Sequence, residues 1–161
     1  MARAKTAIEV GSFKGVTTRR LSYLFDKVIS IELDPTLHAE AKTRCADRPN
    51  VEILLGDGSV LLPQIIVHAY DALLYFDGHF SGGQTGRGDV PEPVLKEVDL
   101  LKDHLHNVSA VVVDDFRLFG LEPGWPRKSE VLRKLEGIFP EPAWSILVQY
   151  DQFLVARRIA N

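Results

Sequence analysis

The stretch TAIEVGSFKGVTTRRL, residues 6–21, joins a short apolar segment to a segment of helical character through a turn that contains two glycines. Thr6–Val10 predicts a strand, and the residues from Val16 onward predict a helix. Glycine adopts backbone conformations that other residues avoid, so Gly11 and Gly15 predict a tight turn with accessible backbone N–H groups. In an open α/β sheet such turns lie where ligands bind. Two interpretations stay open: a ligand-binding turn, or a turn that only reverses the chain.

Apolar runs alternate with segments of helical periodicity along the rest of the chain, which is typical of a parallel sheet covered by helices. Strands are expected at Thr6–Val10, Lys27–Glu32, Val51–Gly56, Asp71–Asp77, Ser109–Asp115, Trp144–Gln149 and Gln152–Arg158. Helices are expected at Val16–Leu24, Pro35–Ala46, Gly58–His68, Pro91–His104 and Pro126–Glu136. Only Tyr150 and Asp151 separate the last two strands, so we expect these strands to pair as an antiparallel hairpin.

Length and composition narrow the class of protein. The chain has 161 residues, of which 45% are hydrophobic, and this favours a single domain over residues 1–161. The net charge of -3 gives no basic surface for a polyanion, so no nucleic-acid partner is expected. Cys45 is the only cysteine, which excludes an intramolecular disulfide. With neither a secretory signal nor an apolar run of about 20 residues, we expect a cytoplasmic protein and no membrane partner.

Acidic residues lie at or near the ends of the first three predicted strands: Glu9, Glu32 and Asp57. A carboxylate that follows the glycine turn by about 20 residues can accept both hydroxyls of a ribose, and Glu32 has this position. Asp34, just before Pro35, is expected to cap the following helix. Asp57 is a candidate acceptor for an exocyclic amine, or a second helix cap. The G-x-x-x-G spacing of the first turn differs from the G-x-G-x-x-G pattern of dinucleotide-binding proteins.

The segments IEVGSFKG, ISIELDP, LLGDGS and LLYFDGH, in this order, resemble the class I methyltransferases that use S-adenosylmethionine. The final WSILVQYDQFLVARR resembles the antiparallel strand pair that closes their seven-stranded sheet. The resemblance covers essentially the whole chain and implies a single-domain, doubly wound, Rossmann-like α/β fold, mostly parallel, with an antiparallel C-terminal hairpin. The cofactor-binding residues that it implies are Glu9, Gly11, Ser12 and Gly15 around the methionine part, Glu32 on the ribose and Asp57 on the adenine. The sequence departs from the family at Ser12, Phe13 and Lys14, where small residues are usual.

Three more acids end the fourth and fifth predicted strands: Asp77, Asp114 and Asp115. Neighbouring strands lie about 4.8 Å apart, and carboxylates at that spacing repel unless they share a proton or bind a cation. The pattern looks like that of metal-dependent O-methyltransferases, so these residues are candidate metal ligands, with Mg²⁺ the preferred ion. In the alternative interpretation, one acid caps a turn and the other pairs with Arg117 or Arg87.

Asp77 and His79 are the candidate catalytic residues, as general base or as an extra metal ligand, although His79 could simply be solvated. The glycine-rich segment Gly78–Val90 predicts a lid over the site. We expect methyl transfer to an oxygen of a small molecule such as a sugar or a phenol. A non-catalytic nucleoside-binding module and a nucleotide-dependent oxidoreductase are the alternatives.

The resemblance also bears on oligomeric state. Related enzymes commonly place one or two helices before the first strand, over the acceptor site, whereas here about five residues precede that strand. We therefore expect either an open acceptor pocket or a pocket covered by another subunit of a homo-oligomer.

Overall fold

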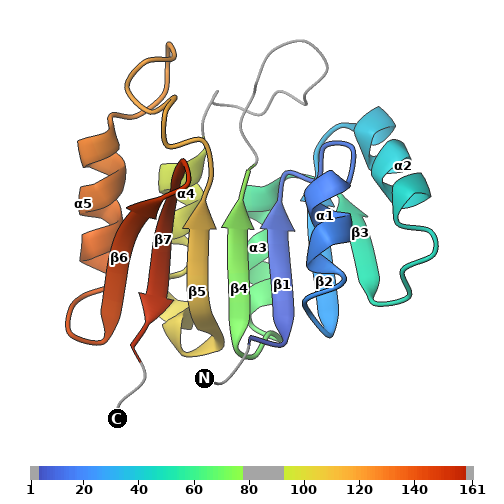
Figure 1. Ribbon diagram of the computed structural model, residues 1–161, viewed down its shortest axis with the longest axis horizontal. Helices are drawn as coiled ribbons and strands as arrows, with labels where there is room; N and C mark the ends of the chain where they lie inside the picture. Colours follow the sequence, from blue (N-terminus) through green and yellow to red (C-terminus); the bar gives the residue numbers. More distant parts are fainter. Residues whose placement is uncertain (1–3, 78–92, 159–161) are drawn as a thin grey trace.

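The computed structural model describes residues 4–77 and 93–158. One seven-stranded sheet has the order β3-β2-β1-β4-β5-β7-β6 (Figure 1). The strands β1 to β5 are mutually parallel, and β7 runs antiparallel to both β5 and β6. Their bounds are β1 (Thr6–Val10), β2 (Lys27–Glu32), β3 (Val51–Leu55), β4 (Ala72–Phe76), β5 (Val108–Val113), β6 (Trp144–Gln149) and β7 (Gln152–Arg157). The predicted fold class is confirmed.

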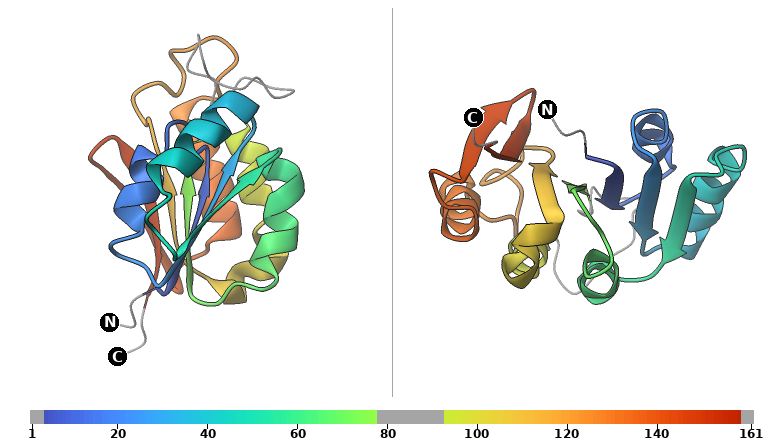
Figure 2. Two further views of the ribbon diagram at one scale, coloured as in Figure 1. Left: turned by 90° about the vertical axis from the view of Figure 1, so that its right-hand side faces the viewer. Right: turned by 90° about the horizontal axis from the view of Figure 1, so that it is seen from below.

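Helices cover both faces of the sheet, as Figure 2 shows: α1 and α2 lie on one face, and α3, α4 and α5 on the other. Their bounds are α1 (Val16–Leu21), α2 (Pro35–Arg44), α3 (Gly58–Ile66), α4 (Val94–Asp99) and α5 (Lys128–Ile138), with a 3₁₀ segment η1 (Lys102–Asn107) before β5. The chain first builds outward from β1 to β3 and then returns through α3 to β4. This reversal places the ends of β1 and β4 side by side, at the point where open α/β sheets bind ligands.

The β6–β7 hairpin has the predicted two-residue turn. Tyr150 and Asp151 both have positive φ, 50° and 68°. Turns with two positive φ angles match the right-handed twist of paired strands. The hairpin thus inserts β7 between β5 and β6, as predicted.

Several helix boundaries differ from the prediction. Within the described residues, the expected helix Pro91–His104 is two segments, α4 and η1, separated by a turn that buries Leu101. The turn lets Asn107 donate a hydrogen bond from Nδ2 to the carbonyl of Ile66, 2.9 Å away. Helix α5 begins at Lys128 instead of Pro126, after Arg127, whose N–H donates to the Glu130 carboxylate. The first three helices each end two or three residues earlier than expected.

The main hydrophobic core lies between the sheet and the helices α3, α4 and α5, and includes Ile8, Leu74, Val111, Leu135 and Phe153. Smaller clusters lie under α1 and α2. Close packing in this core fixes the positions of the parallel strands. The loops that follow their carboxyl ends therefore begin at fixed places. No described helix is both long and apolar enough to cross a membrane.

Candidate functional site

The turn after β1 has the left-handed conformation that glycine favours. Gly11 has a φ of 97° and Gly15 a φ of 73°. The N–H groups of Gly11 and Ser12 both donate to the carbonyl of Ile31, at 2.9 and 3.1 Å. A Cβ on Gly15 would lie 3.0 Å from Cα of Ala41. Gly15 is therefore required by its backbone conformation and by the close approach of α2, whether or not it also contacts a ligand.

A buried polar cluster lies beneath this turn. Glu9 is fully buried, and its Oε2 accepts hydrogen bonds from the hydroxyls of Thr18 and Ser30, both at 2.5 Å. The buried Ser12 hydroxyl contacts the Ser30 hydroxyl, also at 2.5 Å. Glu9 Oε1 has no hydrogen-bond partner among the described residues. Burial raises the pKa of Glu9 to about 7, despite the two hydroxyls that favour its charged form.

Two members of this cluster, Thr18 and Ser30, were absent from the sequence prediction. Ser30 is the polar residue inside the otherwise apolar run of β2, and the sheet register pairs it with Glu9. A polar residue that interrupts a buried strand is a usable signal, because burying a hydroxyl without a partner is unfavourable. Thr18 carries no comparable signal, since threonine is common on exposed helix faces.

Glu32 joins the first two strand ends through one carboxylate. Its Oε2 accepts from the N–H of Phe13 at 2.7 Å, and its Oε1 accepts from the N–H of Asp34 at 2.9 Å. Glu32 is buried at the end of β2. A carboxylate offers about four acceptor positions, so two backbone bonds leave capacity for hydroxyl donors.

Asp57 and Asp34 both cap helices. Asp34 accepts from the N–H groups of Thr36 and Leu37, as predicted. Asp57 accepts from the N–H of Ser59 at 2.7 Å, which confirms the capping interpretation for this residue. Its contact with an adenine stays a prediction.

Asp77 follows β4 and lies beside the ends of β1 and β5. The N–H of Asp77 donates to the carbonyl of Val10, and the N–H of Asp114 donates to the carbonyl of Phe76. Burial raises the pKa of the Asp77 carboxyl to about 8, and the negative charges of Asp114, Asp115 and Glu9 add to this shift. A carboxyl with such a pKa exchanges its proton near neutral pH.

The predicted metal site finds no support. Asp114 accepts hydrogen bonds from the Tyr75 hydroxyl, from Nε2 of Gln152 at 3.2 Å, and from the N–H of Asp115 at 2.9 Å. Asp115 has a φ of 55° and forms an ion pair with Arg117 at 2.6 Å. The ion pair with Arg117 is the alternative that the sequence had left open for these acids.

In residues 4–77 and 93–158, no group of three His, Cys, Asp or Glu side chains is arranged to hold a metal ion. Asp114 already accepts hydrogen bonds from protein donors, and Asp115 is paired with the positively charged side chain of Arg117. His79, Arg87 and the predicted lid Gly78–Val90 lie outside the described residues.

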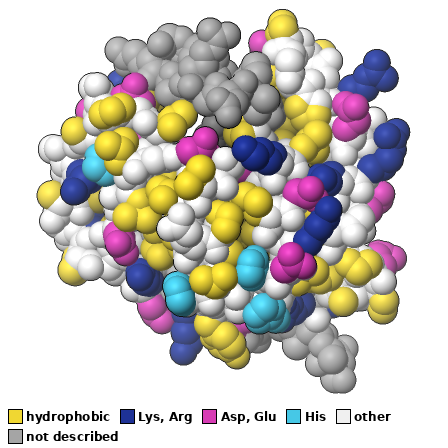
Figure 3. Space-filling model, turned by 180° about the vertical axis from the view of Figure 1, so that it is seen from behind, with side chains coloured by type: hydrophobic (Ala, Val, Ile, Leu, Met, Phe, Trp, Pro, Cys, Tyr) yellow, Lys and Arg dark blue, Asp and Glu magenta, His cyan; other side chains and the backbone are white. Residues whose placement is uncertain are grey.

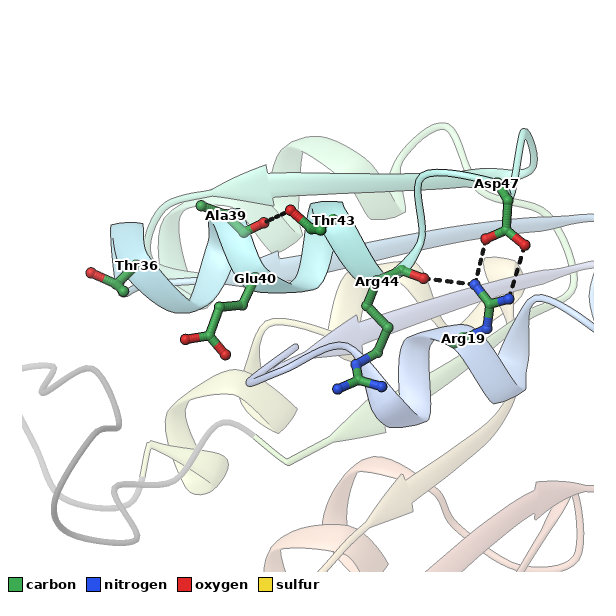
Figure 4. A pocket seen from close by; sticks show the side chains of 7 residues that line it. All are labelled: Arg19, Thr36, Ala39, Glu40, Thr43, Arg44 and Asp47. Carbon is green, nitrogen blue, oxygen red and sulfur yellow. Dashed lines mark hydrogen bonds and ion pairs between the residues drawn. The ribbon is translucent and has the colours of Figure 1, made fainter.

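A separate hollow of about 760 Å³ lies along α1 and α2 (Figure 4). It is lined by Arg19, Thr36, Ala39, Glu40, Thr43, Arg44 and Asp47. Arg19 binds both carboxylate oxygens of Asp47 and donates to the carbonyl of Arg44 at 2.6 Å. The lining contains none of the predicted site residues.

Of the comparisons with known proteins, only the one with solved structures gives matches, and these show the fold. The sequence matches no protein-family model, and the search of curated proteins gives no match. Among solved structures, the SAH-bound Podospora anserina methyltransferase PaMTH1 aligns with a TM-score of 0.69 at 12% identity, covering 96% of this chain and 72% of that chain. A protein from Streptococcus mutans, proposed to be a methyltransferase and solved with SAH, aligns with a TM-score of 0.67 at 13% identity, covering 95% and 87%.

A proposed rRNA methylase from Clostridium thermocellum aligns with a TM-score of 0.69 at 14% identity, over 95% of this chain and 87% of that chain. Identities this low carry no information on the acceptor. The alignments cover 95% or more of this chain and concern its fold. The chain therefore has the fold of the class I S-adenosylmethionine-dependent methyltransferases.

Proposed function

We propose that this protein is a methyltransferase that uses S-adenosylmethionine. The observation that carries the proposal is the Glu32 carboxylate, which binds the N–H of Phe13 in the glycine turn and the N–H of Asp34 after β2. These two hydrogen bonds hold the Glu32 carboxylate, a hydrogen-bond acceptor, at the end of β2 beside the glycine turn. This is the arrangement that positions a ribose in nucleoside-binding α/β proteins.

The neighbouring residues fit the rest of the cofactor. Glu9 Oε1 is a buried acceptor without a described partner, next to the turn assigned to the methionine part. Such an atom gains free energy if it meets a cationic donor, and the amino group of S-adenosylmethionine is one. Gly11, Ser12 and Gly15 shape the turn. Asp57 lies at the start of α3, where we propose that it faces the adenine. When bound, the cofactor supplies an electrophilic methyl group on a sulfonium.

We further propose that the acceptor is an oxygen of a small molecule, with Asp77 as general base. The acceptor oxygen forms a bond to the methyl carbon, the carbon–sulfur bond breaks with its electron pair left on sulfur, and the hydroxyl proton passes to the Asp77 carboxylate. A base is most effective when its pKa lies near the working pH, and the pKa of about 8 for Asp77 meets this condition. His79 remains a second candidate base.

A nucleic-acid acceptor is the competing proposal, because the structural neighbours include a proposed rRNA methylase, a 23S rRNA methyltransferase and a pre-rRNA processing protein. The charge argument is against it. The net charge is -3, and on the face formed by α3, α4 and α5 acidic and basic side chains are interspersed (Figure 3). On that face Asp99, for example, pairs with both Lys102 and Lys134. Binding driven by phosphates normally needs a continuous basic surface.

Calorimetric titration with S-adenosylhomocysteine tests the cofactor. We expect the wild type to bind it and Glu32→Gln to bind roughly tenfold more weakly or worse, because the amide nitrogen cannot accept. Glu52→Gln is the matched control, since Glu52 is exposed on the neighbouring strand β3 and pairs with Lys27. Stabilisation by NAD without any response to S-adenosylhomocysteine would instead identify an oxidoreductase.

Transfer of a radiolabelled methyl group tests the acceptor, with panels of sugars, phenols and RNA. Sensitivity to EDTA is measured in the same assay, and full activity after EDTA would agree with a base that acts without a metal. Cofactor binding with no transfer to any acceptor would favour the nucleoside-binding module.

A further inference from the structure

Two strands lie at the edges of the sheet, β3 on one side and β6 on the other (Figure 1). An edge strand presents backbone N–H and C=O groups that no neighbouring strand binds, and proteins usually protect them. At the β3 edge, the N–H of Val51 donates to the carbonyl of Arg48. Nε2 of His38 lies 3.1 Å from the carbonyl oxygen of Ile53. Glu52 adds a charge to this strand, so the β3 edge is protected.

The β6 edge lacks such partners among the described residues. β6 pairs with β7 on one side, and the register across their two-residue turn directs the backbone groups of every second residue toward β7. The hydrogen bond from the N–H of Arg158 to the carbonyl of Ala143 follows the same alternation. The N–H and C=O groups of Ile146 and Val148 therefore point to the free edge, where no described residue binds them. The strand contains neither a charged residue nor a proline.

The second half of β6 is exposed on both faces of the sheet. Side chains alternate between the faces along a strand. Leu147 is 58% exposed, and Val148, on the opposite face, is 51% exposed. Only the first half of the strand is covered, since Trp144 is buried in the main core and Ile146 packs against that core. An apolar, uncharged and unpaired edge of this kind is suited to pairing with another strand.

This edge is complementary to itself. If β6 pairs antiparallel with β6 of a second copy and Leu147 lies on the twofold axis, Ile146 of each copy lies opposite Val148 of the other. Each outward N–H then meets an outward C=O, in two hydrogen-bonded pairs. Leu147 faces its counterpart between these pairs, and no like charges lie opposite each other across β6. A twofold interface requires such a self-complementary surface.

Other registers use fewer of the free groups. A shift of the axis toward Ile146 would pair Val148 with Trp144, whose N–H already donates to the carbonyl of Pro140. A shift toward Val148 would pair Ile146 with Tyr150, which lies in the turn. The register centred on Leu147 is therefore the one that pairs all the free groups of Ile146 and Val148.

We propose that the protein forms a twofold dimer in which the β6 strands of two copies pair antiparallel and join the two sheets into one. The strands β5 and β7 separate β6 from β4. The interface therefore differs from a second subunit that closes the acceptor pocket, because it leaves the carboxyl end of β4 uncovered. The contact is small beside the roughly 1,200–2,000 Å² that stable complexes bury, so we expect a Kd on the order of 10–100 μM.

Sedimentation equilibrium of the full chain, from about 5 μM to 1 mM, measures the association. We expect the wild type to change from monomer to dimer over this range. Leu147→Lys and Leu147→Glu should each raise the Kd at least about tenfold, because like charges then lie opposite each other at the twofold axis. An equimolar mixture of the two variants should dimerise, since a lysine then faces a glutamate.

Val148→Pro tests the hydrogen bonds. The N–H of Val148 points away from β7, so a proline there removes no bond within the chain but two across the dimer. We expect this variant also to associate at least about tenfold more weakly. In the wild type, amide exchange at Ile146 and Val148 should slow as the protein concentration rises. Leu55→Lys is the matched control with unchanged association, because Leu55 is an exposed leucine on the other edge strand, β3.

Several outcomes would overturn the proposal. One is a wild type that stays monomeric at about 1 mM, which would leave the β6 edge for a strand of another protein. Another is an equal loss of association in Leu55→Lys, which would place the interface elsewhere. Unchanged association in the Leu147 variants, or a mixture of them that stays monomeric, would contradict the twofold register centred on Leu147.

Discussion

Asp77 and Asp114 follow neighbouring strands, yet their carboxyl groups have different surroundings. Asp114 accepts hydrogen bonds from Tyr75, from Gln152 and from the N–H of Asp115. Burial and the nearby negative charges raise the pKa of Asp77 to about 8. A carboxyl whose pKa lies near the working pH is suited to accept a proton from a substrate. We therefore propose Asp77, at this edge of the sheet, as the residue that takes the acceptor proton.

Asp77→Asn should separate chemistry from cofactor binding. An amide cannot take the acceptor proton, so we expect methyl transfer to fall about 100-fold or more, with little change in S-adenosylhomocysteine affinity. The folded-state pKa lies above the unfolded value, so the stability contributed by Asp77 is complete near pH 4 and is lost as the pH rises through 8. At pH 8 the variant should therefore be more stable than the wild type, by on the order of 1–3 kcal/mol.

Methyl transfer kinetics and urea unfolding at pH 8 check this prediction. Asp103→Asn is the control, because Asp103 is an exposed carboxylate in η1. If Asp77→Asn kept wild-type turnover, another group, such as His79, would have to take the proton of the acceptor hydroxyl.

At the scale of elements, the start of α3 has almost no free space. Gly58 is buried where α3 passes between β1 and α4. A Cβ added there would lie 2.4 Å from Cγ1 of Val10 and 2.9 Å from Oε1 of Glu97. Val10 is in the core of β1, so the strand cannot move aside without disturbing the sheet. This contact sets how closely α3, which carries the Asp57 cap, approaches the sheet.

Gly58→Ala should therefore destabilise the protein by roughly 1–3 kcal/mol, as overpacking does in other cores. Gly137→Ala in α5 is the matched substitution, because a Cβ at that position meets nothing within 4 Å. In this open helical position alanine should stabilise by about 0.5–1 kcal/mol. Urea denaturation of both variants measures the difference. If both substitutions changed the free energy of unfolding equally, the close packing around Gly58 would make no contribution to stability.

At the scale of the whole molecule, Glu9, Asp77 and Glu97 are carboxyls from three different elements with raised pKa values. Burial raises the pKa of Glu97 to about 7, and the charge of Asp57 adds to the shift. The corresponding values are about 7 for Glu9 and about 8 for Asp77. Between pH 5 and 8 these three carboxyls therefore hold more protons in the folded protein than in the unfolded chain.

We expect the free energy of unfolding to fall as the pH rises from about 5.5 to 8, because stability decreases with pH wherever the folded state binds more protons. Asp47, Asp99 and Asp151 have lowered pKa values and act in the opposite sense, but only at more acidic pH. Urea unfolding across this range provides the measurement, and Glu97→Gln should reduce its slope. Stability that rises with pH over the same range would mean that these carboxyls are ionised in the folded protein.

Local patterns in the sequence were sufficient for the architecture and part of the site. The alternation of apolar runs and helical segments predicted all seven strands and the closing hairpin, because burial imposes these periodicities on each segment separately. Asp34 was identified as a helix cap from Pro35 alone. Glu32 could be placed at a strand end because the apolar run of β2 stops there.

Only the tertiary structure decided which side chains meet. The Tyr75 hydroxyl reaches Asp114 across 39 residues of chain, and Gln152 reaches it across 38. Thr18 and Ser30 converge on Glu9 because α1 and β2 pack against β1 in a register that no local pattern encodes. The hydrogen bond from Tyr75 to Asp114 likewise joins two neighbouring strands that are far apart in the sequence. The reason is physical: periodicity and capping depend on residues a few positions apart, whereas hydrogen-bond partners and the pKa of a buried carboxyl depend on how distant segments pack.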